Sequence, residues 1–157
     1  MAPMSPRSLR RPGSTGQRRP EAGRVTFETE FETRHSDCFA ATGYVHAGVL
    51  LALTEMAYAR FESHCGIDAG HKPEQVYAVQ RSTAATYFSP LRWQEGARIR
   101  VRTTEANDRG FDQDFEILSA ADGREIARFT HRWVLLDTRA GRPVPLTDEV
   151  QRLLLQV

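Results

Sequence analysis

Cysteine is scarce in this chain, since Cys38 and Cys65 are the only two among 157 residues. Two cysteines are too few for a disulfide scaffold, and neither has the spacing of a metal site. We therefore interpret both as reduced thiols of a cytosolic protein and expect no bound metal. The alternative is a nucleophilic Cys38 with His35 and Asp37 close to it, although sequence neighbours rarely form a catalytic triad.

Long apolar runs and an excess of one charge are missing as well. No segment has the apolar length of a signal sequence or a membrane span, so we expect a soluble cytoplasmic protein with no membrane partner. The formal net charge is +1, and residues 1–23 hold five arginines and one glutamate, so the remaining chain carries −3. This mildly acidic remainder argues against a nucleic-acid partner.

Apolar periodicity is lacking in residues 1–23, which are rich in Pro, Gly, Ser and Arg. This composition predicts a disordered tail, followed by a single domain over residues 24–157. A basic arm that binds nucleic acid or a membrane surface is one alternative. The other is an organelle transit peptide, but Pro6, Pro12 and Gly13 would interrupt its amphipathic helix.

The apolar residues that are present gather in the run AGVLLALTEMAYA, residues 47–59, which predicts a long helix ending near Gly66. Glu55 is the one charged residue in this run, and on a helical wheel it shares a face with small apolar residues. That second face suggests a helix enclosed on several sides. A carboxylate in such a setting is disfavoured unless it is paired, hydrogen-bonded or used in chemistry. The wheel places two sets of residues: an apolar stripe of Val49, Leu50, Leu53, Met56, Ala57 and Phe61, and the Glu55 face with Gly48, Ala52 and Ala59.

The segment ATGYVH, residues 41–46, is a glycine-containing loop that brings His46 to the start of this helix. A helix N-terminus offers unpaired N–H groups and positive potential. Those donors would bind a carbonyl oxygen, while Glu55 would activate water or attack directly.

Alternating apolar and polar residues predict strands over residues 24–35, 76–88, 97–104, 111–118 and 124–136. The sequence NDRG, residues 107–110, predicts a hairpin between the third and fourth of these strands. Residues 139–145 are rich in turn formers, and Thr147 would cap a short C-terminal helix. The order is one strand, a long helix and a meander of four strands, so we predict an α+β protein whose antiparallel sheet wraps around one central helix.

This order and three segments resemble the hot-dog fold of the 4-hydroxybenzoyl-CoA thioesterase-like superfamily over most of residues 24–145. The segments are residues 43–49 (GYVHAGV) together with Glu55, residues 77–102 (YAVQRSTAATYFSPLRWQEGARIRVR), and residues 132–146 (RWVLLDTRAGRPVPL).

The resemblance implies one of two catalytic designs, which differ in the place of the acid. In the first, a D-x-D-x-x-G loop precedes the helix; Asp37 matches its first Asp only with an extra loop residue, and the second Asp is missing. In the second, His-Gly-Gly starts the helix and an acid follows nine residues after the His. Here His46, Ala47 and Gly48 depart from that pattern only at Ala47, and Glu55 stands at the acid's position. The resemblance therefore favours Glu55.

On this basis Glu55 is the expected general base or nucleophile and the Ala47 N–H the oxyanion donor. His46 would orient the substrate, and Asp37 would hold water. Other interpretations stay open: a Glu55 paired with an Arg of a neighbouring subunit, a His46 that only packs, and an Asp37 that caps its loop. Four residues are candidates for the acyl pocket: Phe39, Thr42, Gly43 and Tyr44. The alternative is a place in the core for Phe39 and a role in shaping the loop for the others.

A row of arginines, Arg98, Arg100 and Arg102, lies on one face of a predicted strand. It is more typical of a solvated strand face than of a binding site, although arginines also suit the phosphates of coenzyme A. Coenzyme A would be part of the substrate, and we expect no further cofactor.

The sequence thus predicts a thioesterase that hydrolyses an acyl-CoA or an acyl-carrier-protein thioester. A hot-dog dehydratase or hydratase is the second hypothesis, and a non-catalytic module that binds an acyl thioester or an aromatic ligand is the third. The resemblance also implies a homodimer formed by joining sheets edge to edge, with a homotetramer as a further possibility.

Overall fold

The computed structural model describes residues 26–68 and 70–157. The tail predicted over residues 1–23 lies outside the described part. In chain order the structure has the following elements: β1 (Phe27–Phe31), the 3₁₀ turn η1 (His35–Asp37), α1 (Ala47–His64), β2 (Val76–Tyr87), the 3₁₀ turn η2 (Trp93–Glu95), β3 (Ala97–Asn107), β4 (Gly110–Ser119), β5 (Glu125–Asp137), β6 (Arg142–Val144) and α2 (Asp148–Leu155).

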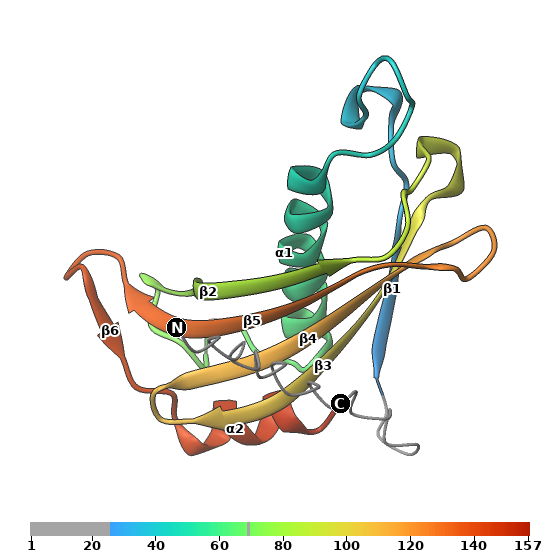
Figure 1. Ribbon diagram of the computed structural model, residues 1–157. Coiled ribbons are helices and arrows are strands. Elements are labelled where there is room, and N and C mark those ends of the chain that lie inside the picture. The colour runs from blue at the N-terminus through green and yellow to red at the C-terminus, as the bar shows by residue number, and fades with distance from the viewer. Residues whose placement is uncertain (1–25, 69) are drawn as a thin grey trace, which may run out of the picture.

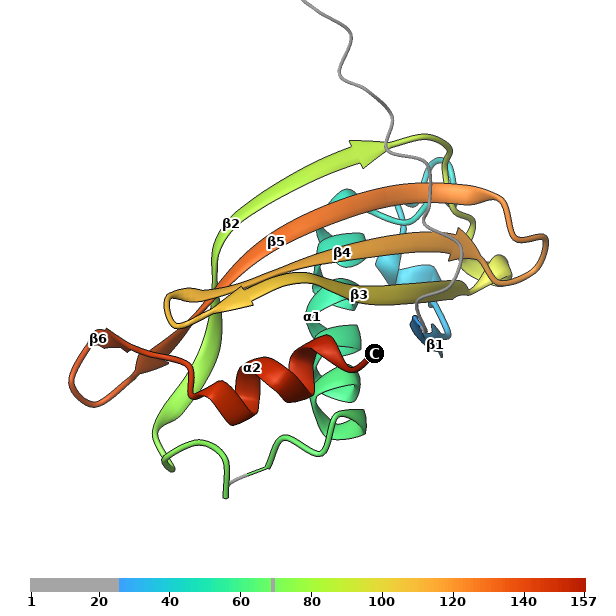
Figure 2. The ribbon, with the colours of Figure 1, turned by 90° about the horizontal axis from the view of Figure 1, so that it is seen from below.

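The strands form one antiparallel sheet in the order β1-β3-β4-β5-β2, with β6 pairing with the end of β5. The sheet curves around α1, whose axis crosses the long strands at a steep angle (Figures 1 and 2). This is the α+β architecture that the resemblance to the hot-dog fold predicts.

The predicted meander of four strands is wrong in one respect, because β2 pairs with β5 and not with its sequence neighbour β3. The segment between them contains Pro90 and the turn η2, so it cannot close as a tight hairpin. It carries the chain from one edge of the sheet to the position beside β1. Among the described residues, the meander begins at β3, continues through β4 and β5, and ends with β6 on the end of β5.

Most predicted elements are confirmed, and the differences lie at their ends. The first strand, predicted to reach His35, ends at Phe31, and the turn η1 begins at His35. The third reaches Asn107, and the segment 139–145, expected as turns, contains the short strand β6.

Gly110 follows the hairpin with φ +142°, and a Cβ there would lie 2.1 Å from the carbonyl oxygen of Trp133. Glycine is therefore required at this position.

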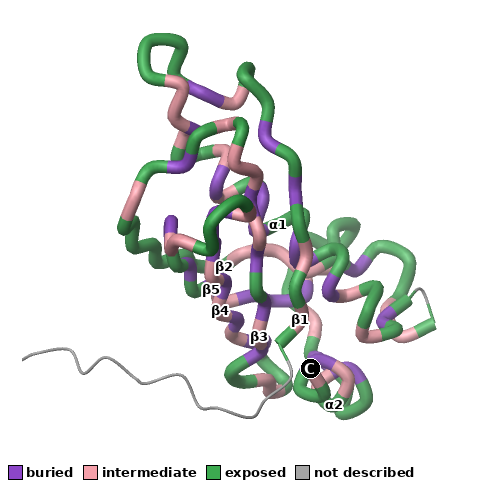
Figure 3. Tube along the Cα trace, turned by 90° about the vertical axis from the view of Figure 1, so that its right-hand side faces the viewer, coloured by how far each residue is buried: buried purple, intermediate pink, exposed green. Residues whose placement is uncertain are grey.

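The core lies between α1 and the concave face of the sheet, where buried residues gather (Figure 3). The predicted apolar stripe of α1 is largely confirmed, since Leu50, Leu53, Ala57 and Phe61 are buried. Met56 was wrongly included and is 51% exposed. Its place on the buried face is taken by other residues of the helix, Thr54 and Tyr58.

The C-terminal helix α2 packs near β3 (Figure 2). Its amphipathic pattern buries Val150 and Leu154, which add to the core. The predicted cap is confirmed, because the hydroxyl of Thr147 accepts a hydrogen bond from the N–H of Val150 at 3.3 Å.

The convex face of the sheet is covered by ion pairs between neighbouring strands. Arg100 on β3 contacts Glu28 on β1 at 2.8 Å and Glu116 on β4 at 3.2 Å. The other two arginines of the predicted row are paired as well: Arg98 with Glu30 and Arg102 with Asp114. The row is therefore a solvated, charge-paired strand face.

Candidate functional site

The loop before α1 is held by backbone hydrogen bonds that fix its exit into the helix. The N–H of Phe39 bonds the carbonyl of Tyr44 at 3.0 Å, and Gly43 turns the chain with φ +67°. The N–H of Val45 bonds the carbonyl of Leu91, and that of His46 bonds the carbonyl of Asp37. His46 thereby becomes the residue that precedes the first helical residue.

The first turn of α1 has free donors. The N–H groups of Val49 and Leu50 bond the carbonyl of His46, whose side chain makes no capping hydrogen bond. Within residues 26–68 and 70–157, the N–H groups of Ala47 and Gly48 have no partner, and both residues are exposed. These two donors lie at the positive end of the helix, where an oxygen with partial negative charge is stabilised.

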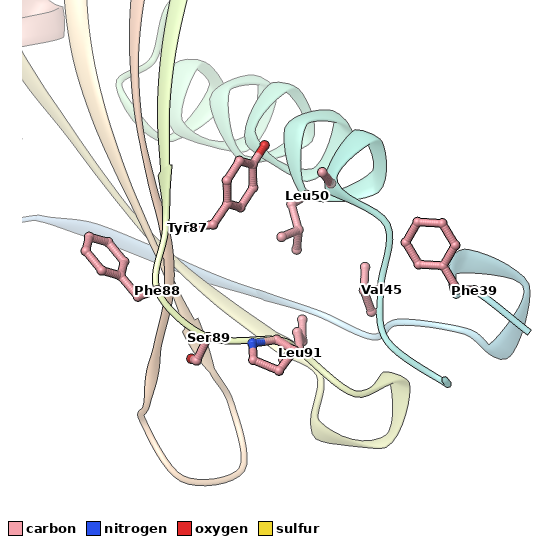
Figure 4. Close-up of a pocket in the computed structure, with 9 residues that line it drawn as sticks. Phe39, Val45, Leu50, Tyr87, Phe88, Ser89 and Leu91 are labelled. Atoms are coloured by element: carbon pink, nitrogen blue, oxygen red, sulfur yellow. The ribbon is translucent and has the colours of Figure 1, made fainter. Parts of the chain in front are cut away.

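Ala47 also lines a pocket of about 390 Å³. Figure 4 shows Tyr87 and Leu91 facing Leu50 and Val45 across this space, with Phe39 on its far side. The lining is mostly apolar and comes from the loop before α1, the first turns of α1 and the segment after β2: Phe39, Val45, Ala47, Leu50, Tyr87, Phe88, Ser89, Pro90 and Leu91. An apolar pocket beside two free N–H donors suits an acyl group whose carbonyl oxygen faces the donors.

Of the four residues predicted for the acyl pocket, Phe39 lines this cavity, whereas Thr42, Gly43 and Tyr44 lie elsewhere in the loop. The segment Tyr87–Leu91 was missed as a pocket wall. Its sequence signal is a pair of adjacent aromatic residues, Tyr87 and Phe88, shortly before Pro90.

Glu55 lies two turns further along α1 and is exposed, together with Gly48, Ala52 and Ala59. The expected common face is confirmed, but its enclosure is not: in this chain the face is open to solvent. In the described part of the molecule the Glu55 carboxylate has no hydrogen bond and no ion pair. About 12 Å of helix axis separate it from Ala47, so it does not line the pocket.

Other contacts show which flank of α1 carries Glu55. Arg60 bonds the hydroxyl of Thr29 on β1, whereas Tyr58 stacks on Trp133 of β5, with ring centroids 4.4 Å apart. At about 100° per residue, Glu55 follows Tyr58 around the helix and lies away from Arg60. Glu55 therefore points away from the buried core, on the same side of α1 as Tyr58, which is the side of β5 and, beyond β5 in the sheet, of the edge strand β2.

His46 packs against Phe39, with ring centroids 3.7 Å apart and the rings tilted by 51°. Phe39 is itself 55% exposed, so the two rings form a surface ledge beside the pocket. This contact serves either expectation for His46, substrate orientation or packing at the helix start.

Asp37 and Cys38 have local structural roles in the loop. The Asp37 carboxylate accepts the N–H of Arg34 at 2.7 Å, which closes the turn η1. The buried Cys38 thiol lies 3.6 Å from the carbonyl of Arg34, and burial, with Asp37 beside it, raises the pKa of this thiol. A raised pKa disfavours the thiolate, so the alternative of a Cys38 nucleophile is unsupported.

A buried hydrogen-bond network that the sequence did not reveal includes Thr54, the residue before Glu55 in α1. The Nε2 atom of His131 on β5 is 2.8 Å from the hydroxyl of Thr54 on α1, and its Nδ1 is 3.0 Å from the hydroxyl of Thr83 on β2. His131 is fully buried, and loss of solvation lowers its pKa to about 4. The imidazole is therefore neutral at physiological pH.

Within the described residues, no three side chains of the types that bind metals lie together. No helix in that same part of the chain is long and apolar enough to cross a membrane.

The thioesterase-like superfamily model matches residues 33–154 of the chain. No match was found among the curated proteins.

Solved structures similar to this chain include thioesterases. A putative oleoyl thioesterase from Lactobacillus plantarum has a TM-score of 0.74 at 21% identity; the match covers 85% of this chain, which spans about half (51%) of that protein. The 1,4-dihydroxy-2-naphthoyl-CoA thioesterase of Synechocystis has a TM-score of 0.71 at 20% identity, with coverage of 83% and 96%. A Thermus thermophilus thioesterase complexed with coenzyme A and Zn has a TM-score of 0.67 at 21% identity, with coverage of 81% and 90%. At these identities the likeness shows the fold.

Proposed function

The chain belongs to the thioesterase-like superfamily, and from that premise we propose that it hydrolyses an acyl thioester of coenzyme A or of acyl-carrier protein. The products are a carboxylic acid and a free thiol. The observation that carries the proposal is the pair of free N–H donors at Ala47 and Gly48, of which Ala47 also lines an apolar pocket.

The thioester carbonyl oxygen lies at the start of α1 in this proposal. The Ala47 N–H and the positive end of the helix stabilise the negative charge that develops on this oxygen during attack. The acyl group occupies the pocket between Leu50 and Tyr87, with Phe39 and His46 beside it. The thiolate leaves readily, so the reaction depends less on a general acid than amide cleavage does.

Glu55 supplies the second part of the chemistry. As a general base it takes a proton from water, and the resulting hydroxide attacks the carbonyl carbon; as a nucleophile it forms an anhydride that water then hydrolyses. The axial separation of about 12 Å prevents Glu55 from contacting the same carbonyl group as Ala47 unless a water bridges them or a second copy supplies one of the two.

A homodimer provides that second copy. The edge strand β2 has twelve residues and is exposed from Arg81 to its last residue, Tyr87, with both Tyr77 and Tyr87 more than half exposed. No other described strand pairs with this edge, and an open edge of this length favours pairing with another strand. Joining β2 to β2 extends the sheet and turns the open Glu55 flank of each helix toward the partner, and pairs of such dimers would make tetramers.

The remaining predicted residues keep smaller roles in this proposal. His46 orients the substrate through the ledge it forms with Phe39, and Thr42, Gly43 and Tyr44 shape the loop that carries both rings. Because the Asp37 carboxylate already closes η1, its capping role is better supported than a role in holding water.

Thiol release over a panel of acyl-CoA substrates with short, long and aromatic acyl groups tests the proposal. We expect stoichiometric thiol and carboxylic acid from at least one substrate class. An enoyl-CoA in the same panel separates the hypotheses, since water addition without thiol release would identify a hydratase. Saturable binding with no turnover across the panel would identify a binding module.

A further inference from the structure

A row of polar side chains crosses the face of the sheet that is covered by α1. Thr103, Gln113, His131 and Thr83 lie on β3, β4, β5 and β2 and are cross-strand partners, so their side chains share one face. The first three are almost completely buried. Polar groups in such a position destabilise the fold unless they are hydrogen-bonded. Apolar packing therefore does not explain why these polar residues are present, and their hydrogen bonds have to be considered.

The hydrogen bonds of this row have a defined direction at α1. The Thr54 hydroxyl is 2.7 Å from the carbonyl of Leu51, which accepts its proton. The Thr54 oxygen is then free to accept the Nε2–H of His131 at 2.8 Å. With its proton on Nε2, the neutral imidazole accepts at Nδ1 from the Thr83 hydroxyl at 3.0 Å.

The amide of Gln80 completes the chain at the sheet edge. Its Oε1 lies 3.1 Å from the Thr83 hydroxyl, while its buried Nε2 has no partner among the described residues. The Thr83 hydroxyl proton is already donated to Nδ1 of His131, so Thr83 can only accept from Gln80. If Oε1 and Nε2 of the Gln80 amide are exchanged, the nitrogen donates to the Thr83 hydroxyl. The result is a one-way chain from Gln80 through Thr83, His131 and Thr54 to the carbonyl of Leu51.

This chain ties the middle turn of α1 to the sheet on the flank that carries Glu55. Arg60 makes the corresponding polar contact on the opposite flank, where it bonds Thr29 at 2.7 Å and the carbonyl of Glu30 at 2.8 Å. Apolar packing is non-directional, whereas these hydrogen bonds resist rotation of the helix about its axis. The direction in which the next side chain, Glu55, leaves the helix depends on that rotation.

We propose that Thr54 and His131 are positioning residues for Glu55: their hydrogen bond fixes the rotation of α1 and so aims the carboxylate at the β2 edge of the sheet. The inference rests on the proposed function, because it assigns a purpose to holding Glu55. Thr54 touches no substrate in this account and acts only through the helix.

The matched pair Thr54→Val and Thr54→Ser isolates the hydroxyl, since Val keeps the branched shape and Ser keeps the hydrogen bond. Thr103→Val is the control for removing a buried hydroxyl elsewhere: Thr103 is 2% exposed, and its oxygen accepts from Gln113 at 3.2 Å on the far side of the row. Thr54→Val loses two hydrogen bonds, the one to the carbonyl of Leu51 and the one from His131, whereas Thr103→Val loses the one from Gln113. Of these three bonds, the one between Thr54 and His131 joins α1 to the sheet.

Steady-state thiol release and its pH profile are measured for these three variants and for Glu55→Gln. We expect Thr54→Val to lower kcat by about tenfold to a hundredfold with KM within about twofold, and to shift the acid limb of the profile. Thr54→Ser and Thr103→Val should keep kcat within about twofold of wild type, although Thr103→Val should melt at a lower temperature.

Equal losses of kcat in Thr54→Val and Thr103→Val would mean a purely structural role and would overturn the inference. Full turnover in Thr54→Val, with turnover abolished in Glu55→Gln, would overturn the positioning role and leave the proposed function standing. Full turnover in Glu55→Gln would overturn both the role of the carboxylate and the inference built on it.

Discussion

The carboxylates on the convex face of the sheet and the carboxylate of Glu55 have opposite surroundings. Glu116 lies within 3.4 Å of both Arg100 and Arg128, and Glu28 contacts Arg98 as well as Arg100. Glu55 lies among exposed small residues of α1, and in the described part of the chain no cation pairs with it.

This contrast distinguishes carboxylates that stabilise the sheet through ion pairs from a carboxylate that makes none in the described part of the chain. On the convex face, acids and arginines from adjacent strands neutralise one another and keep the solvated face from repelling itself. Among the described residues, Glu55 makes no such pairing, so removing its charge leaves none of them without a partner. In the proposed function, this acid, which has no partner in the described part of the chain, is the group that acts on the thioester.

The largest effect is expected from removing the donor at the start of α1. Proline is well tolerated at the first helical position, and His46, with φ −64° and ψ 144°, has a conformation that a following proline accepts. Ala47→Pro therefore deletes the N–H and keeps the helix. We predict a fall in kcat of about a hundredfold to a thousandfold, measured by thiol release. Ala47→Ser keeps the N–H and serves as the control; equal activity in both variants would contradict the oxyanion role.

The buried polar row should make stability depend on pH. The pKa of His131 is lowered to about 4 in the folded protein, whereas it is about 6.5 in the unfolded chain, which therefore binds the extra proton between these values. The stabilisation from the neutral imidazole is complete above about pH 6.5 and is lost as pH falls toward 4. We predict a loss of roughly 3 kcal/mol in the free energy of unfolding over this range.

Denaturant unfolding of wild type and His131→Gln across this pH range measures the effect. Because the two proteins share every other ionisable group, the difference between them at each pH is the informative quantity. Parallel pH curves for the two proteins would contradict the buried, neutral histidine.

The smallest effect is expected from the ion pairs. Glu116→Gln should change the free energy of unfolding by no more than about 1 kcal/mol, with the difference shrinking as salt is added. Thiol release should stay at the wild-type rate. A loss of activity in this variant would contradict the expectation that the carboxylates of the convex face, unlike Glu55, have no part in turnover.

Periodicity predicted most of the fold because each long element buries one face. The helix from Ala47, the hairpin before Gly110 and the cap at Thr147 all follow from local pattern and turn chemistry. The pairing of β2 with β5 did not follow, since the connection through Pro90 decides it and alternation within a strand carries no information about its neighbour.

The site was predictable in part for the same reason. The position of the helix start and the common face of Glu55 with Gly48 depend on local spacing, and the structure has both. The pocket wall at Tyr87 and the contact of His131 with Thr54 join residues far apart in the chain, so local spacing could not reveal them. The exposure of Glu55 was missed because a small apolar face is equally compatible with burial and with an open flank.

The most direct test of the central claim compares thiol release by Glu55→Gln with that by Glu116→Gln in the same assay, with melting temperatures measured alongside. The account predicts that Glu55→Gln loses two or more orders of magnitude in kcat/KM at an unchanged melting temperature, while Glu116→Gln turns over like wild type. Wild-type turnover in Glu55→Gln would contradict it.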